Sequence, residues 1–336
     1  MKKYNIAVVG ATGMVGNKFL KVLSEKNLPV ENYYLYASAK SAGKVVSFMG
    51  KDLTVIELKR ENITDKKIDI ALFSAGASVS RDFAPIFVEA GAVVIDNSSC
   101  FRMDKDVPLV VPEVNPQDIS LHNGIIANPN CSTIQAVVAL KPLNDKYKIK
   151  RIVYSTYQSV SGAGVGGYTD LEEGVKGNAP KKFPYPIFNN LIPQIDVFLD
   201  DGYTKEEKKM IDETRKILHE KDLKITATTV RVPVFYGHSE SINVEFYNPC
   251  TLDGIKDAIK GQQGIVFYDN ISKNIYPMPC VCEDKDEVFV GRIRLDDSVD
   301  YGCNIFVVAD NIRKGAATNA VQIAEYIIKN GIKTSR

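Results

Sequence analysis

The chain has 336 residues, with 42 Lys and Arg against 41 Asp and Glu, so its formal net charge is +1. At roughly 150 residues per domain, this length suggests two domains with a sizeable core. A hydrophobic fraction of 45% and a charged fraction of 25% exclude a disordered or fibrous chain, and the balanced charge gives no electrostatic reason to expect nucleic acid or a membrane surface as partner.

The sequence predicts neither a membrane span nor a secretory signal. The longest stretch without Asp, Glu, Lys or Arg, residues 119–140, is too rich in Asn, Pro, Ser, Thr and Gln to cross a bilayer. The first apolar run is too short for the core of a signal peptide. Six cysteines in a chain this long make no disulfide framework, so we expect reduced thiols and a cytoplasmic protein.

The first 130 residues alternate short apolar runs with helical patterns. Helical spacing follows the first run at residues 15–23 and recurs over residues 81–90. Strands that alternate with helices predict an α/β fold with a Rossmann-type, doubly wound parallel sheet. The expected strands are residues 4–9, 33–37, 68–73, 92–95, 109–111 and 125–127.

The pattern changes after about residue 131. A helix over 132–140 precedes strand-like alternation and a glycine-rich turn at 162–167, and a helix over 205–219 opens with a capping-box pattern at Thr204 and Glu207. Strands that follow one another predict an α+β domain with a mostly antiparallel sheet. The expected strands are residues 151–160, 226–235 and 239–246, and an amphipathic helix is expected over 314–328.

A glycine turn lies between the first predicted strand and its helix. Gly10, Gly13 and Gly16 are spaced G-x-x-G-x-x-G, which permits a tight turn and close approach of a pyrophosphate to the helix N-terminus. A strand-to-helix turn without a ligand would have the same pattern. If a dinucleotide binds here, we expect its contacts at Gly10, Thr12, Gly13, Met14 and Val15.

The segment after the second strand favours NADP over NAD. A carboxylate there would accept the ribose hydroxyls of NAD and repel a 2′-phosphate. Residues 37–43 contain no acid and instead include Ser38, Lys40 and Ser41. A solvated Ser/Lys loop is the alternative.

Cys131 lies at the junction of a predicted strand and a predicted helix. A thiol at a helix N-terminus faces unpaired backbone N–H groups and the positive end of the dipole, which favour a nucleophilic thiolate. A small core residue is the alternative. That second interpretation is applied to the other cysteines, and Cys280 and Cys282, which alternate in a strand-like setting, lack the further ligand pair of a zinc site, so no metal is predicted.

Two further residues suggest a reactive site. Arg231 interrupts an otherwise uncharged strand pattern, where it either pairs structurally or receives a carboxylate bidentately. His238 follows seven residues later between two strands, as a candidate base or as an ordinary turn histidine.

These motifs together closely resemble the aspartate-β-semialdehyde dehydrogenase family. They match in order and span nearly the entire chain. The segments are GATGMVG at 10–16, SAG at 74–76, DNSSCFRMDKDVPLVVPEVN at 96–115, NPNCST at 128–133, QSVSGAG at 158–164, RVPVFYGHSE at 231–240 and DNIRKGAA at 310–317.

The resemblance implies a glyceraldehyde-3-phosphate-dehydrogenase-like fold and a homodimer. It implies the NADP-dependent reductive dephosphorylation of β-aspartyl phosphate to aspartate semialdehyde, in the synthesis of lysine through diaminopimelate, threonine and methionine. We expect residues 1–130 with 311–336 to bind NADP, and residues 131–310 to carry catalysis, substrate binding and dimerisation.

The resemblance also implies a role for each matched residue. Cys131 is the acylated nucleophile, His238 the acid/base, and Gln158 orients the substrate. The other implied contacts are Arg231 to the α-carboxylate, Glu206 to the amino group, Lys209 and Arg102 (with Asn97 beside it) to the phosphate, and Ser161, Gly162 and Asn311 to the nicotinamide half of NADP.

Alternatives remain at this point. Glu206 and Lys209 share a helix face at i and i+3, where a solvated ion pair would look the same. Another acyl-phosphate or acyl-thioester reductase would keep Cys131 and change the residues around Arg231. A non-catalytic NADP-binding sensor would need only the glycine turn and would leave Cys131, Arg231 and His238 unexplained.

Overall fold

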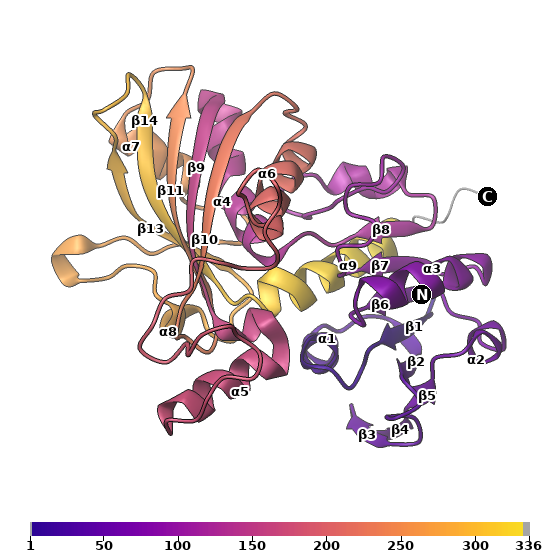
Figure 1. The fold of residues 1–336 in the computed structure, drawn as a ribbon. Helices are drawn as coiled ribbons and strands as arrows, with labels where there is room; N and C mark the ends of the chain where they lie inside the picture. The colour runs from indigo at the N-terminus through magenta and orange to yellow at the C-terminus, as the bar shows by residue number, and fades with distance from the viewer. Residues whose placement is uncertain (1, 332–336) are drawn as a thin grey trace. The chain divides into compact units, whose positions relative to one another are not determined.

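The computed structural model describes residues 2–331, and the chain divides into two compact units. The first unit contains the described residues up to Pro129 and those from Ala316 onward, and the second unit contains residues 130–315. Figure 1 shows the fold with the chain coloured from its N-terminus to its C-terminus. Among residues 2–331, no helix is both long and apolar enough to cross a bilayer.

The first unit is built on a six-stranded sheet in which every pair of strands is parallel. This confirms the predicted doubly wound sheet. In spatial order the strands are β5 (Ile56–Glu57), β2 (Val30–Ala37), β1 (Tyr4–Val9), β6 (Ile70–Phe73), β7 (Val93–Asp96) and β8 (Ile125–Ala127). A separate hairpin pairs β3 (Val45–Phe48) with β4 (Lys51–Thr54).

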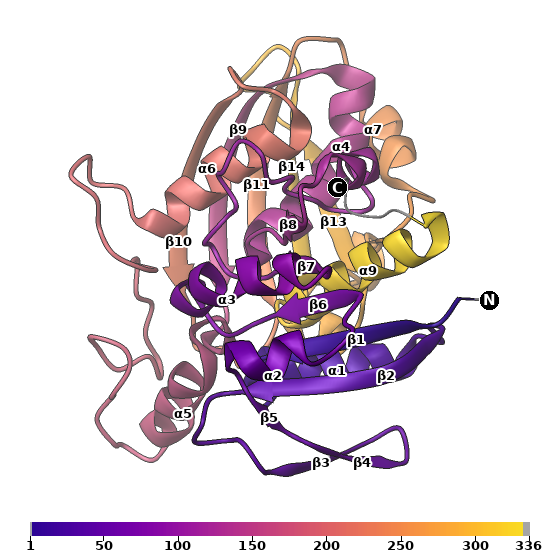
Figure 2. The ribbon, with the colours of Figure 1, turned by 90° about the vertical axis from the view of Figure 1, so that its right-hand side faces the viewer.

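Both faces of this sheet are covered, because successive strand residues point to opposite sides. Ile6 and Val8 pack in one apolar cluster with residues of α1 (Met14–Glu25) and α9 (Asn319–Asn330). Ala7 and Val9 pack in the other cluster with residues of α2 (Arg60–Thr64) and α3 (Ala77–Glu89). Figure 2 shows these strands and helices from a second direction. Parallel strands buried on both faces explain the nearly continuous apolar runs of the sequence.

The strand predicted at residues 109–111 is wrong. Only an isolated bridge forms there, between Leu109 and Ala127. Pro108 and Pro112 flank the segment, and neither has an N–H to donate to a neighbouring strand. A short 3-10 helix, Pro116–Leu121, follows.

The second unit contains a mixed six-stranded sheet. The outer pairs, β9–β10 and β12–β13, are parallel and the three inner pairs are antiparallel. The predicted second sheet, mostly antiparallel, is confirmed in this form. The strands in order are β10 (Lys224–Arg231), β9 (Ile149–Gln158), β11 (His238–Phe246), β14 (Gly302–Ala309), β13 (Val288–Leu295) and β12 (Ile265–Phe267).

Two helices, α4 (Cys131–Tyr147) and α6 (Lys205–Leu218), pack on the sheet of the second unit. Residues 132–140 of α4 are buried without interruption, so this part of the helix has no solvent-facing side. The capping box predicted at Thr204 and Glu207 is present at the start of α6. The remaining elements are α5 (Gly164–Val175), α7 (Leu252–Ile259), α8 (Pro279–Cys282), 3-10 turns at Val160–Ala163 and Ile271–Lys273, and a π-helical turn at Arg313–Thr318.

Two local predictions in the second unit are wrong. The glycine-rich segment 162–167, expected as a turn, contains a 3-10 turn and the first residues of α5; Gly164 has a φ of +74°, which lets the chain change direction between them. Cys280 and Cys282 lie in the helical turn α8, not in a strand, because Pro279 at its first position favours a helix start.

Candidate active site

Cys131 is the first residue of α4, as the sequence predicts. Asn130 is the N-cap, and its side-chain oxygen accepts hydrogen bonds from the backbone N–H groups of Ser132 at 2.9 Å and Thr133 at 3.4 Å. The Cys131 thiol is half-buried. Gly315 leaves room for it, since a Cβ at that position would lie 2.9 Å from the Cβ of Cys131. The cysteine therefore lies at a capped, crowded helix N-terminus.

Two buried carboxylates of α6 hold the cap in position. The Asn130 backbone N–H donates to Glu213 at 2.7 Å, and its side-chain amide donates to Glu206 at 2.8 Å. Gln158 donates to the Ser132 hydroxyl at 2.8 Å and lies 3.5 Å from the same Glu206 oxygen. The start of α4 is thereby fixed relative to both α6 and the sheet.

Strand register brings Arg231, Gln158 and His238 to one edge of the sheet. Arg231 and Gln158 are paired as the last residues of the parallel strands β10 and β9. His238 begins β11, whose Ser239 pairs with Tyr157 of β9. Residues far apart in the sequence therefore meet where three strands begin or end.

Gly162 shows how close two of these side chains are. A Cβ on Gly162 would lie 2.9 Å from Nη1 of Arg231 and 3.1 Å from both Nε2 and Cε1 of His238. The guanidinium and the imidazole therefore border the same small space, and any larger residue at position 162 would fill it.

Arg231 is buried and positioned by the backbone. Its Nη1 donates to the Ser159 carbonyl at 2.6 Å, and its guanidinium lies 5.9 Å from the centre of the Phe183 ring. Burial lowers the pKa of Arg231, whereas the charges of Glu206 and Cys131 raise it. A guanidinium has five N–H donors, so donors remain for an anionic ligand.

His238 is fully buried. Its Nδ1 lies 3.1 Å from both the backbone nitrogen and the hydroxyl of Ser159. Burial and then the charge of Arg231 lower the pKa of His238 well below its ordinary value, so the imidazole is neutral at pH 7.

Glu206 and Lys209 form a partly buried ion pair at one side of this cluster. Lys209 Nζ lies 3.2 Å from Glu206 and 2.7 Å from Asp196, and the Lys209 side chain is 20% exposed. Burial lowers the pKa of Lys209, but the two carboxylates outweigh burial and raise it. The pair is therefore not the solvated ion pair that the sequence left as an alternative, because two carboxylates hold the Lys209 ammonium group in place.

Ser161 and Asn311 are linked to His238 through the Ser159 hydroxyl. The Asn311 side-chain amide donates to the Ser161 hydroxyl at 3.1 Å, and its oxygen accepts from the Gly237 backbone N–H at 3.0 Å. The same oxygen also accepts from the Ser159 hydroxyl at 3.0 Å. The two residues thus belong to one buried hydrogen-bond network.

In the first unit, the glycine turn joins β1 to α1. Gly10 has a φ of +82°, and a Cβ there would lie 2.8 Å from the Ser74 carbonyl. Gly13 caps α1 without a side-chain hydrogen bond, and the first turn contains no acid. A helix start with this composition suits an anion such as a pyrophosphate.

The loop after β2 is exposed at Ser38 and Lys40. The Thr12 hydroxyl lies 3.4 Å from that of Ser41, which links this loop to the glycine turn. No acidic residue stands between Ala37 and Gly43. Hydroxyls and one cation therefore border the region where a ribose 2′-substituent is expected.

Arg102 and Asn97 lie together in the first unit. Arg102 is buried, and its guanidinium donates to the backbone carbonyls of Asn128 and Asn97, both at 2.9 Å. The Asn97 side-chain oxygen accepts from the Asn128 amide at 2.7 Å. The roles that the resemblance implies for this pair stay predictions.

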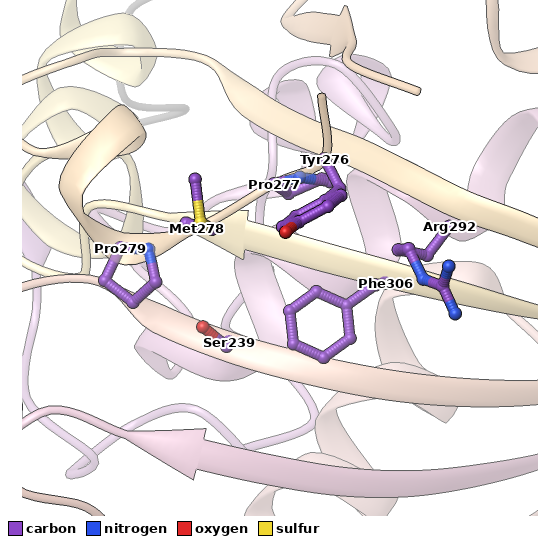
Figure 3. Close-up of a pocket in the computed structure, with 7 residues that line it drawn as sticks. All are labelled: Ser239, Tyr276, Pro277, Met278, Pro279, Arg292 and Phe306. Atoms are coloured by element: carbon purple, nitrogen blue, oxygen red, sulfur yellow. The ribbon is translucent and has the colours of Figure 1, made fainter. Parts of the chain in front are cut away.

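A separate cavity of about 520 Å³ lies in the second unit, lined by residues that include Ser239, Tyr276 and Phe306. Figure 3 shows the Tyr276 and Phe306 rings near one another, with Arg292 at one end of the group. Ser239 points away from the face that carries its neighbours His238 and Glu240, because side chains alternate along a strand. This cavity is therefore on the opposite face of the sheet from the cluster around Cys131.

Sequence reasoning missed several residues of the site. Asn130 had a signal, since Asn directly before a helix is a preferred cap. The contacts of Glu213, Asp196 and Ser159 depend on how distant elements pack, and no local pattern reveals them.

Comparisons with known proteins agree over almost the entire chain. The family models described as semialdehyde dehydrogenase, NAD binding domain, and semialdehyde dehydrogenase, dimerisation domain, match residues 5–122 and 140–314. An aspartate-semialdehyde dehydrogenase of Aquifex aeolicus is 57% identical over 98% of this chain and 99% of its own. One from Bacillus subtilis is 48% identical over 97% of each chain.

Solved structures give the same result. Aspartate semialdehyde dehydrogenase II of Vibrio cholerae, complexed with ASA, has a TM-score of 0.94 at 47% identity and covers 98% of this chain and 99% of its own. The Candida albicans enzyme with NADP has a TM-score of 0.78 at 29% identity, over 98% of this chain and 100% of its own. The resemblance seen in the sequence motifs is therefore confirmed, and the chain belongs to the aspartate-semialdehyde dehydrogenase family of oxidoreductases, with an NAD(P)-binding domain in its N-terminal part.

Proposed function

We propose that this enzyme reduces β-aspartyl phosphate to aspartate semialdehyde with NADPH, through a thioester on Cys131. The observation that carries the proposal is the position of Cys131 at a capped helix start in the same unit as Arg231, Gln158 and His238. A binding protein without catalysis would have no use for this combination. A nucleophile at a helix N-terminus, close to donors for an anionic substrate, suits acyl transfer.

The first step forms the thioester. The Cys131 sulfur attacks the acyl carbon, the bond from carbon to the phosphate oxygen breaks, and phosphate leaves with the electron pair. Arg231 receives the substrate α-carboxylate with its remaining donors. Glu206, which already accepts from Asn130 and Lys209, is aimed at the substrate amino group. Lys209 offers its ammonium to the phosphate.

The first unit supports NADP as the dinucleotide. Gly10 and Gly13 leave the backbone at the α1 start open to a pyrophosphate, because no side chain caps that helix. Ser38, Lys40 and Ser41 suit a 2′-phosphate, whereas an acid there would repel it. We propose the same five turn residues, Gly10 to Val15 without Ala11, as its contacts, and Ser161, Gly162 and Asn311 as contacts of the nicotinamide half.

The second step reduces the thioester. Bound NADPH would supply the hydride to the acyl carbon. Gln158 orients the thioester through the amide that also reaches Ser132, and His238 acts at the substrate oxygen. Collapse of the resulting hemithioacetal releases the aldehyde and regenerates the Cys131 thiolate.

We also propose a homodimer that works in the cytoplasm, on the route to lysine, threonine and methionine. The match of residues 140–314 to a family model described as a dimerisation domain supports a self-association surface in the second unit. Sedimentation of the purified chain measures the stoichiometry.

The test of the reaction is absorbance at 340 nm with aspartate semialdehyde and NADP⁺, with and without inorganic phosphate. We expect phosphate-dependent NADPH formation that disappears in Cys131→Ala. Steady turnover without phosphate would overturn the acyl-phosphate reaction and the role of Lys209. Absence of any signal from folded protein with either NADP⁺ or NAD⁺ would overturn the dehydrogenase proposal.

A further inference from the structure

We propose that Glu240 is a protonated carboxylic acid that donates a hydrogen bond to Oε1 of Gln135, and that the two residues together position the start of α4. The inference rests on the proposed function in its effect on Cys131. It goes beyond that function, because neither Glu240 nor Gln135 takes part in the proposed reaction.

Gln135 connects the first turn of α4 with the first residue of β11. Its Nε2 donates to the backbone carbonyl of His238 at 3.1 Å. A carbonyl can only accept, so this contact fixes which end of the Gln135 amide faces β11. Residues four apart in an α-helix share a face and are joined by a backbone hydrogen bond, so Gln135 closes the turn that begins at Cys131. A shift of Gln135 relative to β11 therefore also shifts Cys131.

The other end of the Gln135 amide needs a donor. Among the described residues, its buried Oε1 has no hydrogen-bond partner, and no N–H or O–H group donates to the Glu240 carboxyl oxygens. The Gln135 side chain nevertheless acts on Glu240 at hydrogen-bonding range. Two acceptors form a hydrogen bond only when one of them carries a proton, and of these two groups only the carboxyl group gains one near neutral pH. A proton on Glu240 therefore supplies the donor that Oε1 of Gln135 lacks.

The surroundings of Glu240 favour the neutral form. It is fully buried, which raises its pKa well above the ordinary value, and among the described residues only the Gln135 side chain opposes this shift. Tyr154, a titratable neighbour on β9, has its hydroxyl 3.1 Å from that of Thr214. His238, two residues earlier on β11, is neutral at pH 7. No cation therefore holds Glu240 as a carboxylate.

The contact with β11 adds to those that already fix the start of α4. Asn130 is bonded to Glu206 and Glu213 of α6, whereas Gln135 is bonded to β11. Without the Glu240 proton, Oε1 of Gln135 is a buried acceptor with no donor, which favours rotation of the amide away from β11. The nucleophile would then lose one of the contacts that set its position.

The direct test is the infrared spectrum of the purified full-length protein at pH 7. The difference between wild type and Glu240→Gln isolates the bands of this one carboxyl group. We expect the C=O stretch of a protonated carboxylic acid, which is separate from the amide bands. Carboxylate bands in its place would overturn the proposal.

Activity tests the positioning role. The amide of Glu240→Gln replaces the O–H donor with an N–H donor, so we expect it to keep the wild-type kcat. Glu240→Met has a similar size and no donor, and its kcat should fall about 10- to 100-fold, since small displacements of a reacting group are costly. KM for aspartate semialdehyde and for phosphate should stay near the wild-type values. Equal kcat values for the two folded variants would contradict the proposal.

Two further variants separate this role from a general effect on the core. Thr229→Val removes another buried polar group from the same row of the sheet and should keep the wild-type kcat. Gln135→Met should reproduce the loss seen in Glu240→Met, and the double variant should lose no more than the larger single loss, because both changes break one link. Additive losses would show that the two residues act separately and would overturn the proposal.

The proposal can fail separately from the proposed function. If the wild-type enzyme forms no NADPH, the proposed reaction fails, whereas the infrared band still decides the protonation of Glu240. The rate of Cys131 alkylation by iodoacetamide, followed by peptide mass spectrometry, then replaces kcat as the measure. It should differ from wild type in Glu240→Met and match wild type in Glu240→Gln, and equal rates in all three proteins would overturn the positioning role.

Discussion

The two six-stranded sheets bury different kinds of side chain. In the first unit, the buried residues of β1, β6 and β7 are all apolar, apart from Asp96 at the end of β7. In the second unit, the strands bury polar and charged side chains as completely. These residues are Thr156, Gln158, Thr229, Arg231, His238 and Glu240. The first sheet is specified by packing, whereas the second accepts the cost of buried polar groups along the strands that carry the proposed chemistry.

That cost is visible in the row of paired residues that lies two positions along the strands from Arg231, Gln158 and His238. Thr229, Thr156 and Glu240 are register partners across β10, β9 and β11. Among residues 2–331, the hydroxyl oxygens of Thr229 and Thr156 have no hydrogen-bond partner, and the Glu240 carboxyl is fully buried with only the Gln135 side chain acting on it. Fully satisfied cores are the rule, so this row marks a place where stability is lower than packing alone would allow.

The largest expected effect is on substrate binding at Arg231. Arg231→Leu should lower kcat/KM for aspartate semialdehyde roughly 10³-fold or more, which corresponds to a loss of about 4–5 kcal/mol in transition-state binding. The reason is that the α-carboxylate of the substrate would be buried without its charged partner. Thermal unfolding of the variant is measured in parallel, because the change also removes the hydrogen bond to the Ser159 carbonyl and a positive charge near Glu206. A stable variant with wild-type KM and kcat would contradict the role of Arg231.

The opposite behaviour is expected in the first unit. Phe87 is fully buried and makes edge-on contacts with Tyr36 and Phe73. Phe87→Ala should lower the free energy of unfolding by about 3–4 kcal/mol through the cavity it leaves. Denaturant titration measures this loss, and kcat per folded molecule should stay at the wild-type value. A drop in that kcat would show that packing and chemistry are not separable here.

Glu240 should make stability depend on pH. Burial raises its pKa well above the ordinary value and outweighs the opposing effect of the neighbouring Gln135 side chain, so folding retains a proton that the unfolded chain releases above about pH 4.5. Wild-type stability therefore falls as pH rises, and Glu240→Gln removes the penalty. The free energy of unfolding of Glu240→Gln, relative to that of the wild type, should increase by up to about 1.4 kcal/mol per pH unit as the pH rises. The exposed Glu172→Gln serves as control and should show no such slope.

The smallest effect is expected at the phosphate. Lys209→Met should raise KM for inorganic phosphate by about 10-fold, since one partly exposed ammonium is lost. Lys208→Met is the matched control, because the neighbouring lysine pairs with Asp201 instead. Equal effects of the two variants would remove Lys209 from the phosphate site.

The first sheet was largely predictable because its signals are local. The run at residues 4–9 and the glycines after it give β1 and α1 directly, since a parallel strand buried on both faces is apolar at every position. The missed strands β12–β14 are different. Gly291 and Gly302 interrupt or begin them, and their pairing depends on distant partners.

The site was predictable where a residue is unusual for its local pattern. Cys131 follows a capping Asn, and Arg231 is the charge in an uncharged strand. Ser159 and Glu240 have no such signal, because Ser directly after a strand and Glu in an alternating strand are ordinary. Their meaning comes from the register of β11 against β9, which only the folded chain defines.

The central claim is the thioester on Cys131. Enzyme mixed with aspartate semialdehyde and NADP⁺ in the absence of phosphate, quenched in acid and analysed by peptide mass spectrometry, tests it directly. We predict one NADPH per active site and an acyl group on the Cys131 peptide, which later phosphate discharges. NADPH formation with an unmodified Cys131, or with the acyl group on another residue, would contradict the account.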